Sequence, residues 1–149
     1  MRNQGFTLIE LLVVIFIIGI LTGVILPNFV SSRQRARDAR RKHDLVEIKN
    51  ALRLYYNDNQ TYPVTVGFGG EWLPYMRVIP EESLDEWESY GYCVNAADHD
   101  SFLLWACLEN AGDQEAAESA WKCGVTGGGT PPCTSGCTGG TLCYYACGD

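Results

Sequence analysis

An uninterrupted apolar stretch near the N-terminus constrains this chain more than any other feature. Within residues 6–27 the only polar side chains are those of Thr7, Glu10 and Thr22. At about 1.5 Å per residue, a helix of this length spans the roughly 30 Å hydrocarbon core of a bilayer. The stretch is longer than the core of a secretory signal, and no small-residue cleavage site follows it. The sequence therefore predicts a retained transmembrane helix.

Four residues within this stretch have a particular meaning. Glu10 is costly in lipid, by roughly 2.5–3.5 kcal/mol at the bilayer centre and less toward the edge, so we expect it to have a partner. Gly19 and Gly23 share one helix face and would let another helix approach closely, although glycines are common in membrane helices in general. Pro27 removes the backbone bond to the carbonyl of Gly23, which predicts a kink or a local loosening over residues 23–27.

The helical pattern continues beyond the apolar stretch, over residues 28–57. Leu45, Ile48 and Leu52 follow a spacing of three and four, which is typical of one buried helix face. The same face includes Tyr55 and is widened by Val46 and Tyr56. The turn formers of residues 57–60 and the following Tyr62-Pro63 end the helix. We expect the buried face to pack on a globular head formed by residues 58–149.

The head has the pattern of a small antiparallel sheet. Residues 64–89 are predicted to be loop. After it, Tyr90–Val94 and Phe102–Leu108 are predicted to be the two arms of a hairpin. Gln114–Trp121 is predicted to be a short helix. A loop at 124–141 follows, and the last predicted strand is Thr141–Ala146. These elements predict an α+β fold in which a long N-terminal helix packs on a small antiparallel sheet, with a cysteine-rich C-terminal loop.

Charge is distributed unevenly along the chain. Residues 33–53 hold eight basic side chains against three acidic ones, whereas residues 54–149 hold two basic side chains against 14 acidic ones. Such an acidic head is a poor match for nucleic acid, which needs a basic face. The segment from Ser31 to Asp44 is predicted to be a collar that is solvated, or that meets lipid headgroups or the acidic heads of neighbouring subunits. A basic collar after the apolar helix would favour a cytoplasmic head by the positive-inside rule.

All seven cysteines lie in the last 57 residues of the chain, at Cys93, Cys107, Cys123, Cys133, Cys137, Cys143 and Cys147. Their density indicates disulfides and an oxidising compartment, and the odd count leaves at least one outside any intrachain bridge. Cys93 and Cys107 fall on opposite hairpin arms, so we expect them to pair, with the tail cysteines bridging locally. The alternative is a four-thiolate zinc site made by the last four cysteines.

Other chemistry is weakly indicated. Asp98 and Asp100, together with the acidic run at 81–88, offer oxygen ligands for calcium, but they lack the spacing of an EF-hand loop. His43 and His99 have no cysteine or serine at a catalytic spacing, and no glycine-rich phosphate loop is present. We therefore expect no enzymatic activity and no firm cofactor.

The N-terminal region resembles the type IV pilin and pseudopilin family. The match consists of residues 5–11 (GFTLIEL), the apolar helix that follows and Pro27. Residues 48–63 (IKNALRLYYNDNQTYP) also resemble the G-type major pseudopilins of type II secretion and related bacterial pilins. The resemblance covers residues 4–63, and the cysteine-rich tail departs from the G-type pattern.

The resemblance implies roles for particular residues. Gly5 would be the last residue of a leader peptide, residues 1–5, which a prepilin peptidase removes. Phe6 would become an N-methylated N-terminus, and Glu10 would pair with the amine of Phe6 on a neighbouring subunit. Pro27 would mark a region where the helix partly melts inside the filament. G-type pseudopilins bind calcium in the head, which is compatible with the calcium hypothesis.

The sequence thus predicts a structural subunit of a type IV pilus-like filament. The precursor would sit in the cytoplasmic membrane with its head outside, and the processed subunit would join a homo-oligomeric surface filament through an assembly platform. One alternative is a major pseudopilin of a type II secretion system. Another is a membrane-anchored extracellular binding domain, which explains neither Glu10 nor the order of Gly5 and Phe6.

Overall fold

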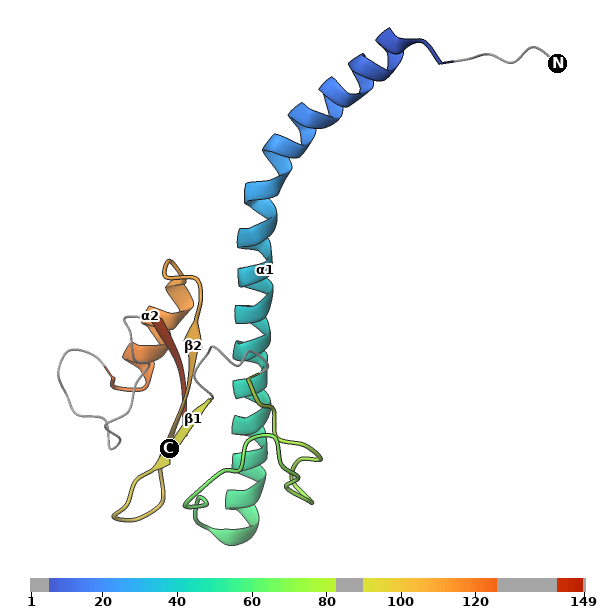
Figure 1. The fold of residues 1–149 in the computed structure, drawn as a ribbon. Coiled ribbons are helices and arrows are strands. Elements are labelled where there is room, and N and C mark those ends of the chain that lie inside the picture. Colours follow the sequence, from blue (N-terminus) through green and yellow to red (C-terminus); the bar gives the residue numbers. More distant parts are fainter. Residues whose placement is uncertain (1–5, 83–89, 126–141, 149) are drawn as a thin grey trace. The chain divides into compact units, whose positions relative to one another are not determined.

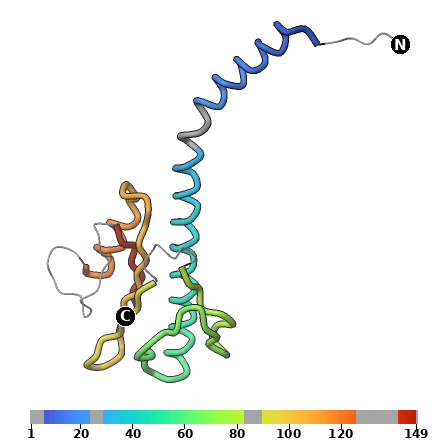
Figure 2. Tube along the Cα trace, in the orientation of Figure 1, coloured from blue at the N-terminus to red at the C-terminus, as the bar shows by residue number. Residues whose placement is uncertain are grey.

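The computed structural model describes residues 6–82, 90–125 and 142–148, without the side chains of residues 24–28 (Figures 1 and 2). The chain separates into two compact units, Met1–Ala36 and Arg37–Asp149. The first unit is helical, and the second holds the rest of the same helix together with the sheet. The two units are described separately below.

Helix α1, Leu8–Asn59, is the longest element of the fold and confirms the predicted long helix. It begins two residues later than expected because Thr7 takes the position before the first turn and its side chain accepts from the backbone N–H of Glu10 (3.4 Å). At the other end the chain leaves the helix at Gln60, whose φ of 56° is left-handed. Across the described residues, no helix combines the length and the apolar character that crossing a membrane requires.

The sheet has three antiparallel strands in the order β1-β2-β3, namely β1 (Gly91–Val94), β2 (Phe102–Leu108) and β3 (Leu142–Gly148) (Figure 1). The predicted hairpin is therefore present, with its second arm as expected. Strand β3 continues two residues past the predicted end at Ala146, because Gly148 still pairs with Phe102 at the start of β2. The central strand β2 is buried along its whole length.

One face of the sheet packs on the second half of α1 and forms the main core. The alternating residues Phe102, Leu104 and Ala106 of β2 point to this face, as the two-residue period of a strand requires. Leu45, Ile48 and Leu52 of the predicted stripe on α1 pack into this core, and each has 0% of its surface exposed. The prediction was wrong for Val46, which is 46% exposed because it lies to one side of this stripe.

The other face of the sheet is covered around Leu103 and Trp105. Trp105 lies so close to Gly91 on β1 that a Cβ there would overlap its ring, at 1.9 Å from Cε2. Helix α2, Gln114–Lys122, contacts β3 in the same unit. Its buried Ser119 joins the two elements, because the hydroxyl accepts from the backbone N–H of Tyr145 (3.0 Å).

The disulfide framework differs from the expected one. Cys123, just after α2, is bonded to Cys147 on β3. The expected Cys93–Cys107 bridge is wrong: the residue opposite Cys93 is Leu103, four positions along β2 from Cys107. That offset is about 13 Å, whereas a disulfide needs Cα atoms within about 7 Å.

The remaining cysteines bear on the zinc alternative. Cys93, Cys107 and Cys143 are also disulfide-bonded. Cys143 and Cys147 therefore carry no free thiolate, and a site made by the last four cysteines is ruled out. Cys133 and Cys137, its other two members, lie outside the described residues.

Candidate functional site

The first unit presents an apolar helix surface that the described chain leaves open. From Leu8 to Leu21 its large apolar side chains are between 46% and 81% exposed, and Phe6 is 80% exposed. Two polar side chains of the apolar helix form hydrogen bonds within the helix. Thr22 donates from Oγ1 to the carbonyl of Ile18 (2.8 Å). Glu10 accepts from the backbone and the hydroxyl of Thr7. The surface therefore offers almost only apolar contact.

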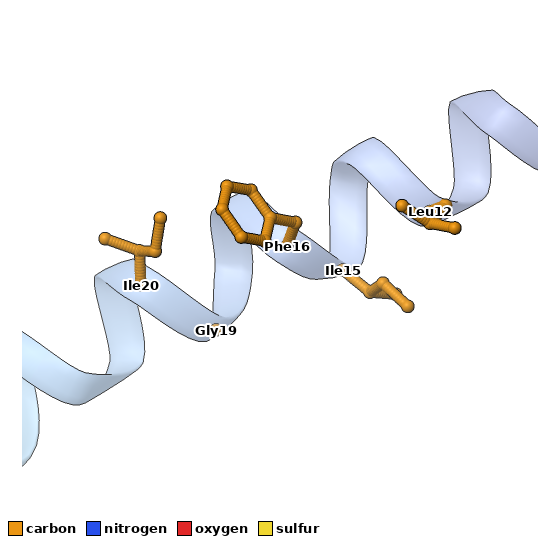
Figure 3. A pocket seen from close by; sticks show the side chains of 5 residues that line it. All are labelled: Leu12, Ile15, Phe16, Gly19 and Ile20. Carbon is orange, nitrogen blue, oxygen red and sulfur yellow. The ribbon is translucent and has the colours of Figure 1, made fainter.

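A shallow hollow of about 500 Å³ lies on this surface (Figure 3). Its lining consists of five residues along about two and a half turns of the helix, namely Leu12, Ile15, Phe16, Gly19 and Ile20. A Cβ at Gly19 would meet nothing within 4 Å, and the same holds at Gly23. The two predicted packing glycines thus face open space, and no residue that the structure describes fills the hollow.

Glu10 is held by the start of its own helix. Its Oε2 accepts from the backbone N–H of Thr7 (2.8 Å) and from the hydroxyl of the same residue (2.6 Å). The backbone N–H of Glu10 in turn donates to Thr7 Oγ1. This arrangement is a capping box, in which the side chain of each residue accepts a hydrogen bond from the backbone N–H of the other residue. The carboxylate is also close to the positive end of the helix dipole, which stabilises its negative charge.

The other predicted assembly residues are placed as follows. Phe6 lines a second hollow of about 340 Å³ together with Ile9, Glu10, Val13 and Val14. The structure thus places the predicted new N-terminal residue beside the predicted acid of the same chain. Gly5 and the side chain of Pro27 lie outside the described residues, so the processing point and the kink stay predictions.

The prediction that the basic collar is solvated or meets other molecules is partly wrong. In the second unit Arg41 is 2% exposed, and Asp38 is equally buried. Their partners come from the head, at a separation of 41 to 72 residues along the chain. The acidic head of the same chain therefore neutralises Arg37, Arg41 and Lys42 of the collar.

Arg41 lies at the centre of this ion network. Its Nη1 donates to Asp38 Oδ1 (2.7 Å) and to Glu109 Oε1 (3.0 Å), and its Nε donates to Glu82 Oε2 (2.5 Å). Arg37 joins the network by a two-pronged contact with Glu109, from Nε at 2.6 Å and Nη2 at 2.5 Å. The bond from Arg37 lowers the pKa of Glu109, since it favours the ionised carboxylate, and the nearby charge of Arg41 acts in the same direction.

Asp38 binds main chain as well as Arg41. Its Oδ1 accepts from the backbone N–H of Glu109 (3.0 Å), and its Oδ2 accepts from that of Asn110 (2.9 Å). These are the two residues immediately after β2, so one side chain of α1 ties the end of the central strand. The sequence offered a signal for this pair, because Asp38 and Arg41 are three residues apart on a helix and therefore adjacent.

Lys42 makes a second link between α1 and the head. Its Nζ donates to both carboxylate oxygens of Asp113 (2.7 and 2.6 Å) and to Glu115 (2.8 Å). Asp113 is also the N-cap of α2 and accepts from the backbone N–H of Ala116 (3.2 Å). Burial opposes the charge of both partners, but their mutual contact outweighs it, so the pKa of Lys42 is raised and that of Asp113 is lowered.

The collar cations that precede this network are differently placed. Arg33 lies over the ring of Phe29, with its guanidinium carbon 4.6 Å from the centroid. Arg35 is exposed. These residues of the first unit match the predicted solvated collar.

The predicted calcium ligands form a turn. Asp98 Oδ1 accepts from the backbone N–H of Asp100 (3.1 Å), and Asp100 Oδ1 accepts from the hydroxyl of Tyr56 (3.2 Å). In the described ranges the cluster that could hold a metal ion is elsewhere, at His43, Asp44 and Glu47.

The sequence is similar to those of known proteins. Residues 1–26 match the prokaryotic N-terminal methylation motif. Over 64 residues, 43% of this chain, the sequence is 42% identical to type II secretion system core protein G of Aeromonas hydrophila and 41% identical to that of Escherichia coli K12. Over 96 residues, 64% of this chain, it is 34% identical to the type IV major pilin protein PilA of Myxococcus xanthus.

These matches span only part of each relative. They cover 45%, 44% and 39% of the three relatives, so the chain matches less than half of each one's length. No solved structure matches the chain. The methylation motif, the named relatives and the long helix on a small antiparallel sheet together make the chain similar to type IV pilins and pseudopilins, and they support a pilin-like subunit.

Proposed function

We propose that this chain is a structural subunit of a helical, type IV pilus-like filament and polymerises through its N-terminal helix. The observation that carries the proposal is the apolar surface of the first unit, whose side chains are about half or more exposed in the single chain. Outside the membrane, each Å² of such surface that neighbouring helices cover is removed from water and contributes about 25 cal/mol, which keeps the helices of an assembled filament packed together. A purely structural role also requires no catalytic residues.

Processing and location follow from the same motif. A prepilin peptidase would cut between Gly5 and Phe6 at the cytoplasmic face, and Phe6 would then be N-methylated. The precursor would wait in the cytoplasmic membrane with its disulfide-bonded head outside, where thiols are oxidised. The prepilin peptidase and the assembly platform would be its partners before assembly.

The capping box gives Glu10 a role at each stage. While the subunit is alone, the carboxylate is satisfied by Thr7 of its own chain. Cleavage creates an ammonium group on Phe6, and in a filament of low dielectric the carboxylate and the ammonium of a neighbouring subunit would offset each other's cost. A charge left without its partner would be strongly unfavourable, so the pair would fix the axial register of neighbouring subunits.

A second candidate function is that of a major pseudopilin in a type II secretion system. The specific observation is that seven relatives named type II secretion system core protein G match the chain, at 38% to 42% identity. The assembly mechanism would be the same in both cases. The two candidates differ in the length of the filament and in what depends on it.

Two measurements test the proposal. Mass spectrometry of the mature chain should find methylated Phe6 as the first residue, whereas an intact Met1 would support a membrane-anchored binding domain instead. Electron microscopy of sheared surface material should then show filaments, and Glu10→Ala should reduce their yield while the protein still enters the membrane. Wild-type filament yield from Glu10→Ala would overturn the register role. Long surface filaments would favour the pilus, and dependence of secretion on the chain would favour the pseudopilus.

Calcium binding by Asp98 and Asp100 remains a separate proposal. It is supported by the two carboxylates that one short turn brings together. Because a bound ion stabilises the folded state, the melting temperature should fall when calcium is chelated. An unchanged melting temperature would remove the idea.

A further inference from the structure

We propose that His43, Asp44 and Glu47 on α1 form a surface site for a divalent transition-metal ion such as Zn²⁺. One ligand atom from each of these side chains lies within 4.8 Å of the other two. The site would lie in the second unit, away from the N-terminal assembly surface in sequence. It does not depend on the filament proposal.

The spacing of the three residues on the helix creates the cluster. Residues 43 and 47 are four apart and residues 44 and 47 are three apart, so His43 and Asp44 both lie beside Glu47 on the helix surface. His43 Nδ1 is 3.8 Å from Glu47 Oε1. Both side chains are at least half exposed, at 70% and 50%, and can close the few tenths of an ångström that two ligands of one ion require. Zinc binds nitrogen at about 2.0–2.1 Å and carboxylate oxygen at about 2.0–2.2 Å.

Asp44 is the residue of the cluster whose side chain is held in position. Its side chain is only 11% exposed, and its Oδ2 accepts from the hydroxyl of Tyr90 (2.7 Å). Carboxylates that bind metals are usually oriented by such an outer hydrogen bond. One carboxylate is thus held in place before an ion arrives, and two mobile ligands complete the set.

The donor set selects the class of ion. A mixture of one imidazole and two carboxylates suits zinc and its neighbours, whereas calcium prefers oxygen ligands alone. The exposed side of the cluster leaves room for water in the remaining coordination positions. One nearby cation opposes binding: Arg40 Nε lies 3.9 Å from Asp44 Oδ2. Its side chain is 72% exposed and is free to move away.

Calorimetric titration of the untagged full chain in detergent micelles with ZnCl₂ tests the proposal. The wild type should bind one ion per chain. His43→Ala and Glu47→Gln should each weaken binding about 10-fold or more, because even outer-shell changes at metal sites cost about that much. The matched control is His99→Asn, which removes the other histidine; asparagine tolerates the left-handed backbone of that position (φ 58°). Its affinity for zinc should equal that of the wild type.

A second readout needs no variant. Zinc should protect His43 from acylation by diethyl pyrocarbonate in the wild-type chain, while the labelling of His99 stays the same. The proposal is overturned if the wild type binds no zinc, if His43→Ala binds it as tightly as the wild type, or if labelling of His43 is unaffected. Displacement of the zinc by millimolar calcium would show a hard-cation site and overturn the assignment to a transition metal.

Discussion

The two units of the chain use their side chains in opposite ways. In the first unit leucines, isoleucines and phenylalanines lie on the helix surface, and Leu12 is 54% exposed. In the second unit the same residue types are inside, and Leu52 on the same helix is 0% exposed. Charges follow the reverse pattern, since Arg41 is 2% exposed whereas Arg33 lies on the surface. In the part of α1 that belongs to the second unit, the apolar core side chains are therefore covered by other residues of the chain. In the part that belongs to the first unit, the described residues leave the apolar side chains exposed.

The difference shows what each half can contribute. Side chains buried in the second unit determine whether the head folds. Side chains exposed in the first unit add little to the stability of one chain and become important only when something covers them. Substitutions of the same kind in the two units should therefore affect different measurements.

The largest effect is expected at the centre of the ion network. Arg41→Ala would leave the carboxylates of Asp38, Glu82 and Glu109 without their shared cation in a buried place. Removing one partner of a buried pair costs about 3–5 kcal/mol of unfolding free energy. Chemical denaturation of the full chain in micelles measures this cost. The control Arg40→Ala, at a 72% exposed position, should change stability by less than about 0.5 kcal/mol. Equal effects of the two substitutions would contradict the network.

A matched pair of leucines gives the most direct test of the contrast. Leu52→Ala should lower the unfolding free energy of the head by about 2–5 kcal/mol, because it opens a cavity in the core. Leu12→Ala should leave this value within about 0.5 kcal/mol of the wild type, because the side chain lies in the open hollow. The same Leu12→Ala chain should give fewer sheared filaments. If Leu12→Ala destabilised the isolated subunit as much as Leu52→Ala, the two halves of the helix would not differ as described.

The disulfide between α2 and β3 sharpens the comparison, since the first unit contains no cysteine. The double variant Cys123→Ser/Cys147→Ser opens a link that spans 24 residues and should cost about 2–4 kcal/mol of unfolding free energy. Thermal unfolding followed by circular dichroism measures the loss. Contacts made by the N-terminal helix should be unaffected, so filaments should still form at temperatures where the head remains folded. An unchanged melting temperature would show that the bond contributes nothing to the head.

The smallest effect concerns pH. The pKa of Glu109 is lower in the folded chain than in the unfolded one, so its ion pairs contribute stability above the unfolded value of about 4.3. That contribution is lost as pH falls through the lowered folded value, and Asp113 acts in the same direction. Unfolding free energy measured between pH 7 and pH 2 should therefore decrease below about pH 4. Glu109→Gln should flatten this decrease, and a decrease of equal size in that variant would assign it to other groups.

Much of the fold was predictable because the signals are local. The spacing of Leu45, Ile48 and Leu52 on one helix face predicted the core contribution of α1, and all three are fully buried. A high content of aromatic and β-forming residues predicted the hairpin strands to within one residue at their ends. The apolar stretch and the position of Glu10 predicted the candidate assembly surface, and its role in assembly stays a prediction.

The errors came from contacts between distant parts of the chain. The collar was interpreted as solvated because its neighbours in sequence are polar, while the partner of Arg37 lies 72 residues away at Glu109. The pairing of Cys93 with Cys107 assumed a hairpin register that differs by four positions from the one observed. The capping box of Thr7 and Glu10 could have been found, since the spacing Thr-x-x-Glu is its signature.

The contact made by Asp38 has a consequence for how freely the head can vary. Both of its oxygens bind backbone N–H groups, so this anchor recognises the path of the chain after β2 and not the side chains there. As far as this contact is concerned, position 110 can exchange its asparagine for nearly any residue. Proline is the exception, because it has no N–H to donate. Heads of diverged sequence could thus be attached to the same helix position as long as an aspartate remains at 38.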